Sequence, residues 1–227
     1  VSLYVDGRFA SHSTNDRDPA RLRSFVTEGV ALTRLLEPDP YRLITPSELY
    51  AGRADVELDQ IDRGLVELDR ETRVSWCQTL TDAASAHDDV ISSTSGVMDS
   101  HSIGARVASN GFEGAVERTS VWYGCETTIR EGEHKRPEAS RWVGGAHLDG
   151  LPSPQETGEE ALRRVLARRG AAKIPSCRTA MIVDREAASG LLGRIFGALS
   201  AGSIQQKRSF LADKLHGSIA SAALTLR

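Results

Sequence analysis

Hydrophobic and polar residues alternate over short distances at the start of the chain. Leu3, Val5 and Phe9 flank Asp6-Gly7, a dipeptide typical of a tight hairpin turn between two strands. Asp18-Pro19 has the form of a helix N-cap followed by proline at the first helical position. Apolar residues then recur at helical spacing: Leu22, Phe25, Val26, Val30, Leu32 and Leu36. The pattern predicts a hairpin followed by a helix that ends at the prolines of residues 37–40.

The spacing of apolar residues along the sequence changes twice in the middle of the chain. Residues 41–64 have no clear period and predict a surface connection, whereas residues 65–86 have the composition of a helix. From residue 90 to residue 133 the period falls to two, and Asn110-Gly111 is a second strong hairpin signal. We therefore expect an antiparallel meander with one face exposed to solvent. The helix is expected to bury Val66, Leu68, Val74, Trp76 and Leu80.

A charged amphipathic helix is predicted over residues 155–169. Pro154 marks its start, and Gly170 is well placed as its C-terminal glycine. Its arginines gather near the negative end of the helix dipole, where cations are stabilising without any ligand. The predicted buried side chains are Ala161, Leu162, Val165 and Leu166, and the basic ones are Arg163, Arg164, Arg168 and Arg169.

The most hydrophobic stretch runs from Ile174 to Leu215, and we interpret it as a buried spine. Met181 to Val183 predicts a strand, and Asp184 predicts the N-cap of a helix that runs from residue 186 to about residue 201. Gly190, Gly193 and Gly197 interrupt this helix. Each glycine costs about 1 kcal/mol relative to alanine inside a helix. A helix that keeps three of them is expected to let another backbone come close, from the same chain or from a partner.

Together these elements predict an α+β fold in two parts. Residues 1–150 are expected to form a mixed αβ domain with the antiparallel meander. Residues 151–227 are expected to form a linker helix and the start of a further domain that contains the apolar helix. A hydrophobic content of 40% with 26% charged residues is typical of a soluble protein, and both ends read as cut from a longer chain.

Composition and motifs exclude several function classes. A net charge of −3 and an aromatic content of 5% argue against binding to nucleic acid. No apolar run is long enough for a membrane span. Cys77, Cys125 and Cys177 lie far apart, which predicts reduced thiols and a cytoplasmic location.

No catalytic or metal-binding motif stands out. The six histidines include no pair three or four residues apart, so no helix can present such a pair to zinc. HExxH, the phosphate-binding loop, GxGxxG and GxSxG are absent. His87-Asp88-Asp89 is interpreted as a solvated helix end. A Ser-His-Asp triad stays open, because geometry and not order along the chain defines one.

Four stretches nevertheless resemble the TldD/PmbA family, which comprises modulators of DNA gyrase and peptide-processing metalloproteases. The resemblance is to its PmbA branch, also called TldE, in particular. It covers most of the chain and is weakest between residues 45 and 90. The stretches are residues 1–19, residues 31–40, residues 100–111, and the series 173–180, 190–193, 203–211 and 213–215.

The resemblance implies that the chain has lost a zinc site. TldD-type members carry a HExxxH motif, and alignment on Gly190 places it on residues 194–199. Arg194, Ile195 and Leu199 then stand where the first histidine, the glutamate and the second histidine would be. None of these side chains is a zinc ligand or a general base. The resemblance thus implies no catalytic residue and no metal in this chain, with zinc in a TldD-like partner.

Three functional hypotheses follow from the resemblance. In the first, the chain is the non-catalytic subunit of a heterodimeric protease and shapes the cleft for unfolded or extended peptides. Strands between residues 103 and 129 then offer an edge for peptide binding by β-augmentation. In the second hypothesis the chain is an active metallopeptidase with unorthodox ligands. In the third it is a homodimeric scaffold that binds peptides without a protease partner. Most of the β-rich C-terminal domain of the family is expected to be absent.

Overall fold

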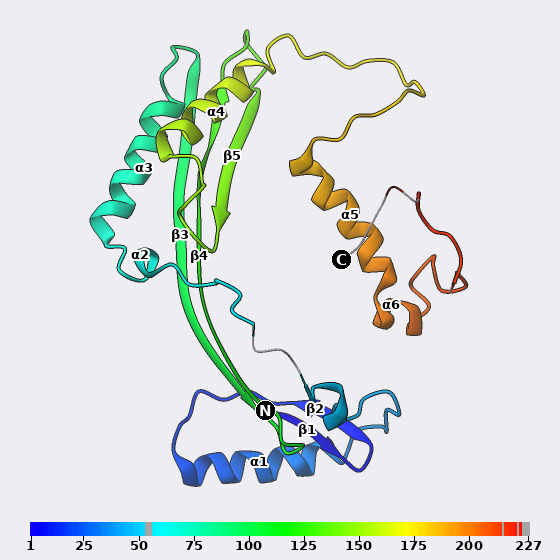
Figure 1. Ribbon diagram of the computed structural model, residues 1–227. Coiled ribbons are helices and arrows are strands. Elements are labelled where there is room, and N and C mark those ends of the chain that lie inside the picture. Colours follow the sequence, from blue (N-terminus) through cyan, green and yellow to red (C-terminus); the bar gives the residue numbers. More distant parts are fainter. Residues whose placement is uncertain (53–55, 215, 222, 224–227) are drawn as a thin grey trace. The chain divides into compact units, whose positions relative to one another are not determined.

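The computed structural model describes residues 1–52, 56–214, 216–221 and 223 of the chain (Figure 1). It divides into two compact units, Val1–Ala171 and Ala172–Arg227. Helices and antiparallel sheets are both present, which confirms the predicted α+β class. Among the described residues, no helix has the length and apolar content that a membrane crossing needs.

The first unit begins with the predicted hairpin and helix. Strands β1 (Ser2–Val5) and β2 (Arg8–Ser11) pair antiparallel. Asp6 and Gly7 form the turn with φ values of 50° and 71°, the left-handed conformation that a two-residue turn of this type requires. Helix α1 (Pro19–Thr33) starts at Asp18, whose side chain accepts hydrogen bonds from the amides of Ala20 and Arg21.

The buried face of α1 differs from the predicted one. Leu32 and Leu36 are 56% and 46% exposed, whereas Gly29 and Thr33 are buried. Gly29 faces the hairpin so closely that an added Cβ would lie 3.0 Å from the Leu3 side chain. The helix lies close to the hairpin at this glycine, which the apolar periodicity could not indicate.

The predicted single helix over residues 65–86 is two helices, α2 (Arg63–Val66) and α3 (Arg70–Ala84). Asp69 separates them, because its side chain accepts a hydrogen bond from the amide of Thr72 and so caps a new helix. This break changes the buried face. Leu65 and Leu80 are buried, but Val66 and Val74 are 38% and 57% exposed, so the prediction was wrong for these two valines.

A three-stranded antiparallel sheet follows, in the order β3 (Val90–Val107), β4 (Glu113–Ile129) and β5 (Glu138–Gly145). It confirms the predicted meander, including the turn at Asn110-Gly111. Val121, Tyr123 and Cys125 alternate along β4 and are buried, whereas Trp122 between them is 49% exposed. One face of this sheet therefore forms the core, together with α3 and α4 (Pro154–Leu166). The short 3-10 helix η1 (Ser47–Leu49) lies in the predicted surface connection.

Helix α4 forms as predicted and closes this core. Ser153 and Glu156 make a reciprocal capping box at its start, and Gly170 follows its end with φ at 73°. Ala161 and Val165 are buried, as expected. Arg163 and Arg164 both pair with Glu160, so two of the predicted basic residues take part in ion pairs on their own helix.

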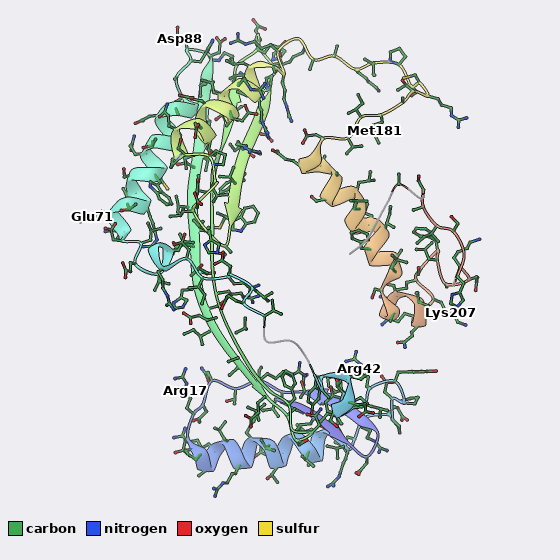
Figure 2. The ribbon with its side chains drawn as sticks, viewed as in Figure 1. Arg17, Arg42, Glu71, Asp88, Met181 and Lys207 are labelled. Carbon is green, nitrogen blue, oxygen red and sulfur yellow. The ribbon has the colours of Figure 1, made fainter. Side chains whose placement is uncertain are left out.

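The second unit contains α5 (Arg185–Leu199) and α6 (Ala201–Gln205). Asp184 caps α5 through the amide of Glu186, as predicted. The predicted strand over residues 181–183 does not form, because no strand of the described chain pairs with it. Met181, labelled in Figure 2, is 74% exposed in this segment.

The interpretation of residues 174–215 as a buried spine is also wrong for the described residues. Ile182 is 99% exposed and Ile174 is 73% exposed, and Leu211 is the buried apolar side chain of this unit. A high apolar content indicates that a segment packs against other polypeptide. It does not show that this polypeptide belongs to the same 227 residues. Leu215 lies outside the described residues.

Candidate functional site

Helix α5 holds the three residues that the family resemblance aligns with the zinc motif. Arg194 is exposed, Ile195 is half-buried and Leu199 is 38% exposed. α5 is a continuous α-helix through these positions. Since successive residues turn by about 100°, Arg194 and Leu199 point about 140° apart around the helix axis. A regular helix thus does not bring these two positions to one point.

These residues do not fit a zinc ion. Zinc binds imidazole, thiolate or carboxylate groups, which Arg194, Ile195 and Leu199 lack. Across the part of the chain that the structure describes, no group of three or more His, Cys, Asp or Glu side chains is arranged to hold a metal. We therefore assign no metal-dependent step to the described residues of this chain.

The glycines of α5 form one exposed stripe. Gly190, Gly193 and Gly197 are three and four residues apart, so they lie on the same side of the helix. A Cβ atom added at any of them would meet nothing within 4 Å. Leu191 and Phe196 are also exposed, at 47% and 38%. Within the described residues of the second unit, no other backbone comes within 4 Å of these Cβ positions, so the expected close approach is not found inside this unit.

The cysteines offer no activated nucleophile in the core. Cys125 is fully buried on β4, and desolvation raises the pKa of its thiol to about 11. A thiol that stays protonated at neutral pH is a poor nucleophile. Cys77 and Cys177 are free thiols as well, half-buried and exposed respectively.

Two histidines join carboxylates at the edge of the sheet. His147 Nε2 donates to the carbonyl oxygen of Asp59 over 2.6 Å, and His101 Nε2 lies 2.9 Å from Glu117 Oε1. The bond to Asp59 is the main cause that raises the pKa of His147, with smaller contributions from nearby acidic side chains. The His147 bond holds Asp59 next to the end of β5, and the Arg63–Glu117 ion pair holds residue 63 next to β4, whereas the His101–Glu117 pair joins β3 to β4.

A groove with a volume of about 800 Å³ lies in the first unit, between β1 and the turn that joins β3 to β4. Its lining includes Ser2 and Tyr4 on one side and Ala105 and Val107 on the other. This volume is within the range of ligand-binding pockets. The hairpin signal at Asn110-Gly111 predicted the turn, but no sequence signal indicated that it would meet β1.

Comparison with known proteins identifies the family. The family model of the PmbA/TldA metallopeptidase central domain matches residues 64–169. The family model of the PmbA/TldA metallopeptidase C-terminal domain matches residues 176–227. Metalloprotease PmbA of Escherichia coli O157:H7 is 27% identical over 235 residues, which cover 100% of this chain and 50% of that protein. The PmbA homologue of Haemophilus influenzae is 24% identical and aligns with 95% of this chain and 47% of that protein.

Solved structures agree with this assignment. A proposed modulator of DNA gyrase from Bacteroides thetaiotaomicron superimposes with a TM-score of 0.89 at 32% identity, over 97% of this chain and 50% of that one. TldE from Thermococcus kodakarensis shares the fold, with a TM-score of 0.56 at 15% identity, over 71% of this chain and 35% of that one. The chain spans about half the length of the curated relatives that it matches. The matched domains and the fold together show that this chain belongs to the PmbA/TldD metallopeptidase family.

Proposed function

We propose that this chain is the zinc-lacking, non-catalytic subunit of a TldD/PmbA-type protease complex. The observation that carries the proposal is the residue set Arg194, Ile195 and Leu199 on a regular, exposed helix within a metallopeptidase family. In such a complex a TldD-like partner holds the zinc ion, and this chain shapes the cleft that receives extended peptides.

The exposed glycine stripe of α5 supports a partner of some kind. Gly190, Gly193 and Gly197 leave room for another backbone, and Leu191 and Phe196 beside them are only partly covered. A TldD-like subunit is the partner that we favour. The same stripe also fits a second copy of this chain, so a homodimeric peptide-binding scaffold is the second candidate. A cytoplasmic location remains a prediction.

Co-expression tests the proposal directly. The full-length protein is expressed with the HExxxH-bearing paralogue of its own cell and purified by a tag on this subunit. We expect the paralogue to co-purify, zinc to bind only to the paralogue, and peptide cleavage to require both chains. Stoichiometric zinc in this subunit alone, or cleavage by it alone, would favour an active metallopeptidase with unorthodox ligands and overturn the proposal. A homodimer that does not bind the paralogue would favour the homodimeric peptide-binding scaffold.

A further inference from the structure

The three-stranded sheet has a second face, which points away from the core. Tyr123 of β4 is buried in the core, so its neighbours Trp122 and Gly124 point to the other face, because side chains alternate along a strand. Their partners across the ladder are Gly144 and Trp142 of β5, which lie on the same face. Each tryptophan is thus paired with a glycine of the neighbouring strand.

The glycines let the two indoles lie on the backbone of the sheet. A Cβ added at Gly144 would be 2.4 Å from Cδ2 of Trp122, and one added at Gly124 would be 2.8 Å from Cδ2 of Trp142. Cδ2 joins the two rings and carries no hydrogen, so these approaches come from the ring face and not from its edge. The other face of each indole points outward, and Trp122 and Trp142 are 49% and 40% exposed.

The charged side chains on this face are acidic. The face is made of alternate residues of 92–98 in β3, 122–128 in β4 and 138–144 in β5. Among these described residues the ionisable side chains are Glu126 and Glu138, and both are exposed. Glu126 pairs with Ser140, which places it one row from Trp142. An aromatic face and a carboxylate both attract a cation, so this face fits a positively charged ligand.

The spacing of the two indoles fits an extended peptide. Trp122 and Trp142 belong to adjacent rows of the face. Rows on one face are two residues apart, which is about 6.8 Å along a strand. Alternate side chains of an extended peptide are separated by the same distance. A peptide that runs along the strands can therefore place two alternate side chains on the two indoles.

We propose that this face binds an extended peptide through an arginine or lysine side chain that lies on Trp142 beside Glu126. The peptide side chain two residues away lies on Trp122, whose row contains Met98 and Gly144 and no charge, which favours an apolar group. This inference rests on the proposed function, in which the chain handles extended peptides. It adds the substrate class, namely peptides with a basic residue.

The test uses the full-length protein and two acetylated, amidated pentapeptides. The first is Ser-Leu-Ser-Arg-Ser, and the second has citrulline in place of arginine, a neutral side chain of nearly the same shape. Fluorine NMR of protein labelled with 5-fluorotryptophan measures binding, with signals assigned by Trp122→Phe and Trp142→Phe. We expect the arginine peptide to shift both signals. The citrulline peptide should bind about threefold to tenfold more weakly, the combined scale of a cation–π contact and an exposed ion pair.

Substitutions locate the charge and the ring. Glu126→Gln should weaken the arginine peptide about threefold and leave the citrulline peptide unchanged. Glu133→Gln is the matched control, because it removes the same charge in the turn after β4, where the side chain is 91% exposed. Trp142→Leu should weaken the arginine peptide about fivefold. Circular dichroism checks that these variants are folded, and the comparison of the two peptides on the wild type needs no variant.

Several outcomes would overturn the inference. Equal affinity for the two peptides, or equal losses in Glu126→Gln and Glu133→Gln, would mean that this face does not select a cation. Arginine amide that binds as tightly as the pentapeptide would mean that the face takes a small cation and not a peptide. Tryptophan signals that respond neither to the peptide nor to a soluble paramagnetic agent would mean that the rest of the full-length chain, or a second copy, covers the face.

Co-purification with the paralogue is scored separately from peptide binding. A protein that pairs with the paralogue but does not prefer the arginine peptide would sink the inference and leave the proposed function intact. A protein that prefers the arginine peptide but does not pair with the paralogue would support the inference and count against the protease complex.

Discussion

At the scale of single residues, His147 links the stability of the first unit to pH. Its ring donates to the carbonyl of Asp59, and the carboxylates of Asp59, Asp62 and Asp149 favour its charged form. The bond to Asp59 is the main reason that the pKa of His147 is raised above 6.5. This contribution to stability is complete below the unfolded pKa and is lost as pH rises through the folded pKa.

We therefore expect the urea midpoint of the wild-type chain to fall as the pH rises from about 6.5 through the raised pKa of His147. In His147→Gln this fall should be smaller. His134→Gln is the control, because the His134 side chain is 92% exposed. Unfolding curves at a series of pH values make the comparison. Parallel pH profiles for the wild type and His147→Gln would show that the contact contributes nothing.

Single residues also show how far the site could be predicted. The alignment on Gly190 predicted that Arg194, Ile195 and Leu199 replace the zinc motif, and this prediction needs only the residue types along the sequence. The sequence could not show that Ile195 is half-buried while Arg194 is exposed, since burial depends on what packs on α5. It also gave no indication of the groove, which depends on two edges that are distant in sequence, Ser2 and Ala105.

At the scale of elements, local capping signals decided what could be predicted. α1, α4 and α5 each begin at a side chain that caps the helix, Asp18, Ser153 and Asp184 respectively. Asp69 is a cap of the same kind, but it lies inside a helical pattern and was missed. β5 was not predicted, because no turn dipeptide precedes it. It is defined by its register against β4, which is a long-range property.

Two glycine substitutions separate packing from helix propensity. Gly158 of α4 faces α3, and an added Cβ would lie 2.7 Å from the Leu80 carbonyl oxygen and 2.7 Å from the Ala83 Cβ. Gly158→Ala should therefore lower the free energy of unfolding by about 1–3 kcal/mol, the usual cost of overpacking. Urea unfolding of both proteins measures the change. A variant as stable as the wild type would contradict the close packing of α3 and α4.

Gly190→Ala is the counterpart, because its Cβ would meet nothing within 4 Å. It should stabilise α5 by about 0.5–1 kcal/mol, the difference in helix propensity between alanine and glycine. Amide hydrogen exchange of α5 in the isolated chain measures this local stability. Faster exchange in the variant would mean that another segment of the protein occupies the space above the stripe.

At the scale of the whole molecule, the two units differ in how well they bury their apolar residues. The first unit closes a core around Leu80, Val121 and Val165. In the second unit, Ile182 and Phe210 are 99% and 75% exposed. The chain spans about half the length of its curated relatives. Its apolar content could therefore predict that the second unit packs against other polypeptide, but not which polypeptide this is.

The partner hypothesis leads to a prediction that uses neighbouring residues of α5 with opposite expected results. Gly193→Leu should abolish co-purification with the HExxxH-bearing paralogue, because a leucine side chain would hold an approaching backbone away from the glycine stripe. The substitution has open space in the isolated chain, so folding should be unaffected. Arg194→Ala should leave co-purification, zinc content and peptide cleavage unchanged, since Arg194 is exposed and a guanidinium group is not a zinc ligand. Pull-down and metal analysis of the two complexes decide the matter. A Gly193→Leu variant that still pairs would remove the stripe from the interface, and zinc loss in Arg194→Ala would give this helix a role in the metal site after all.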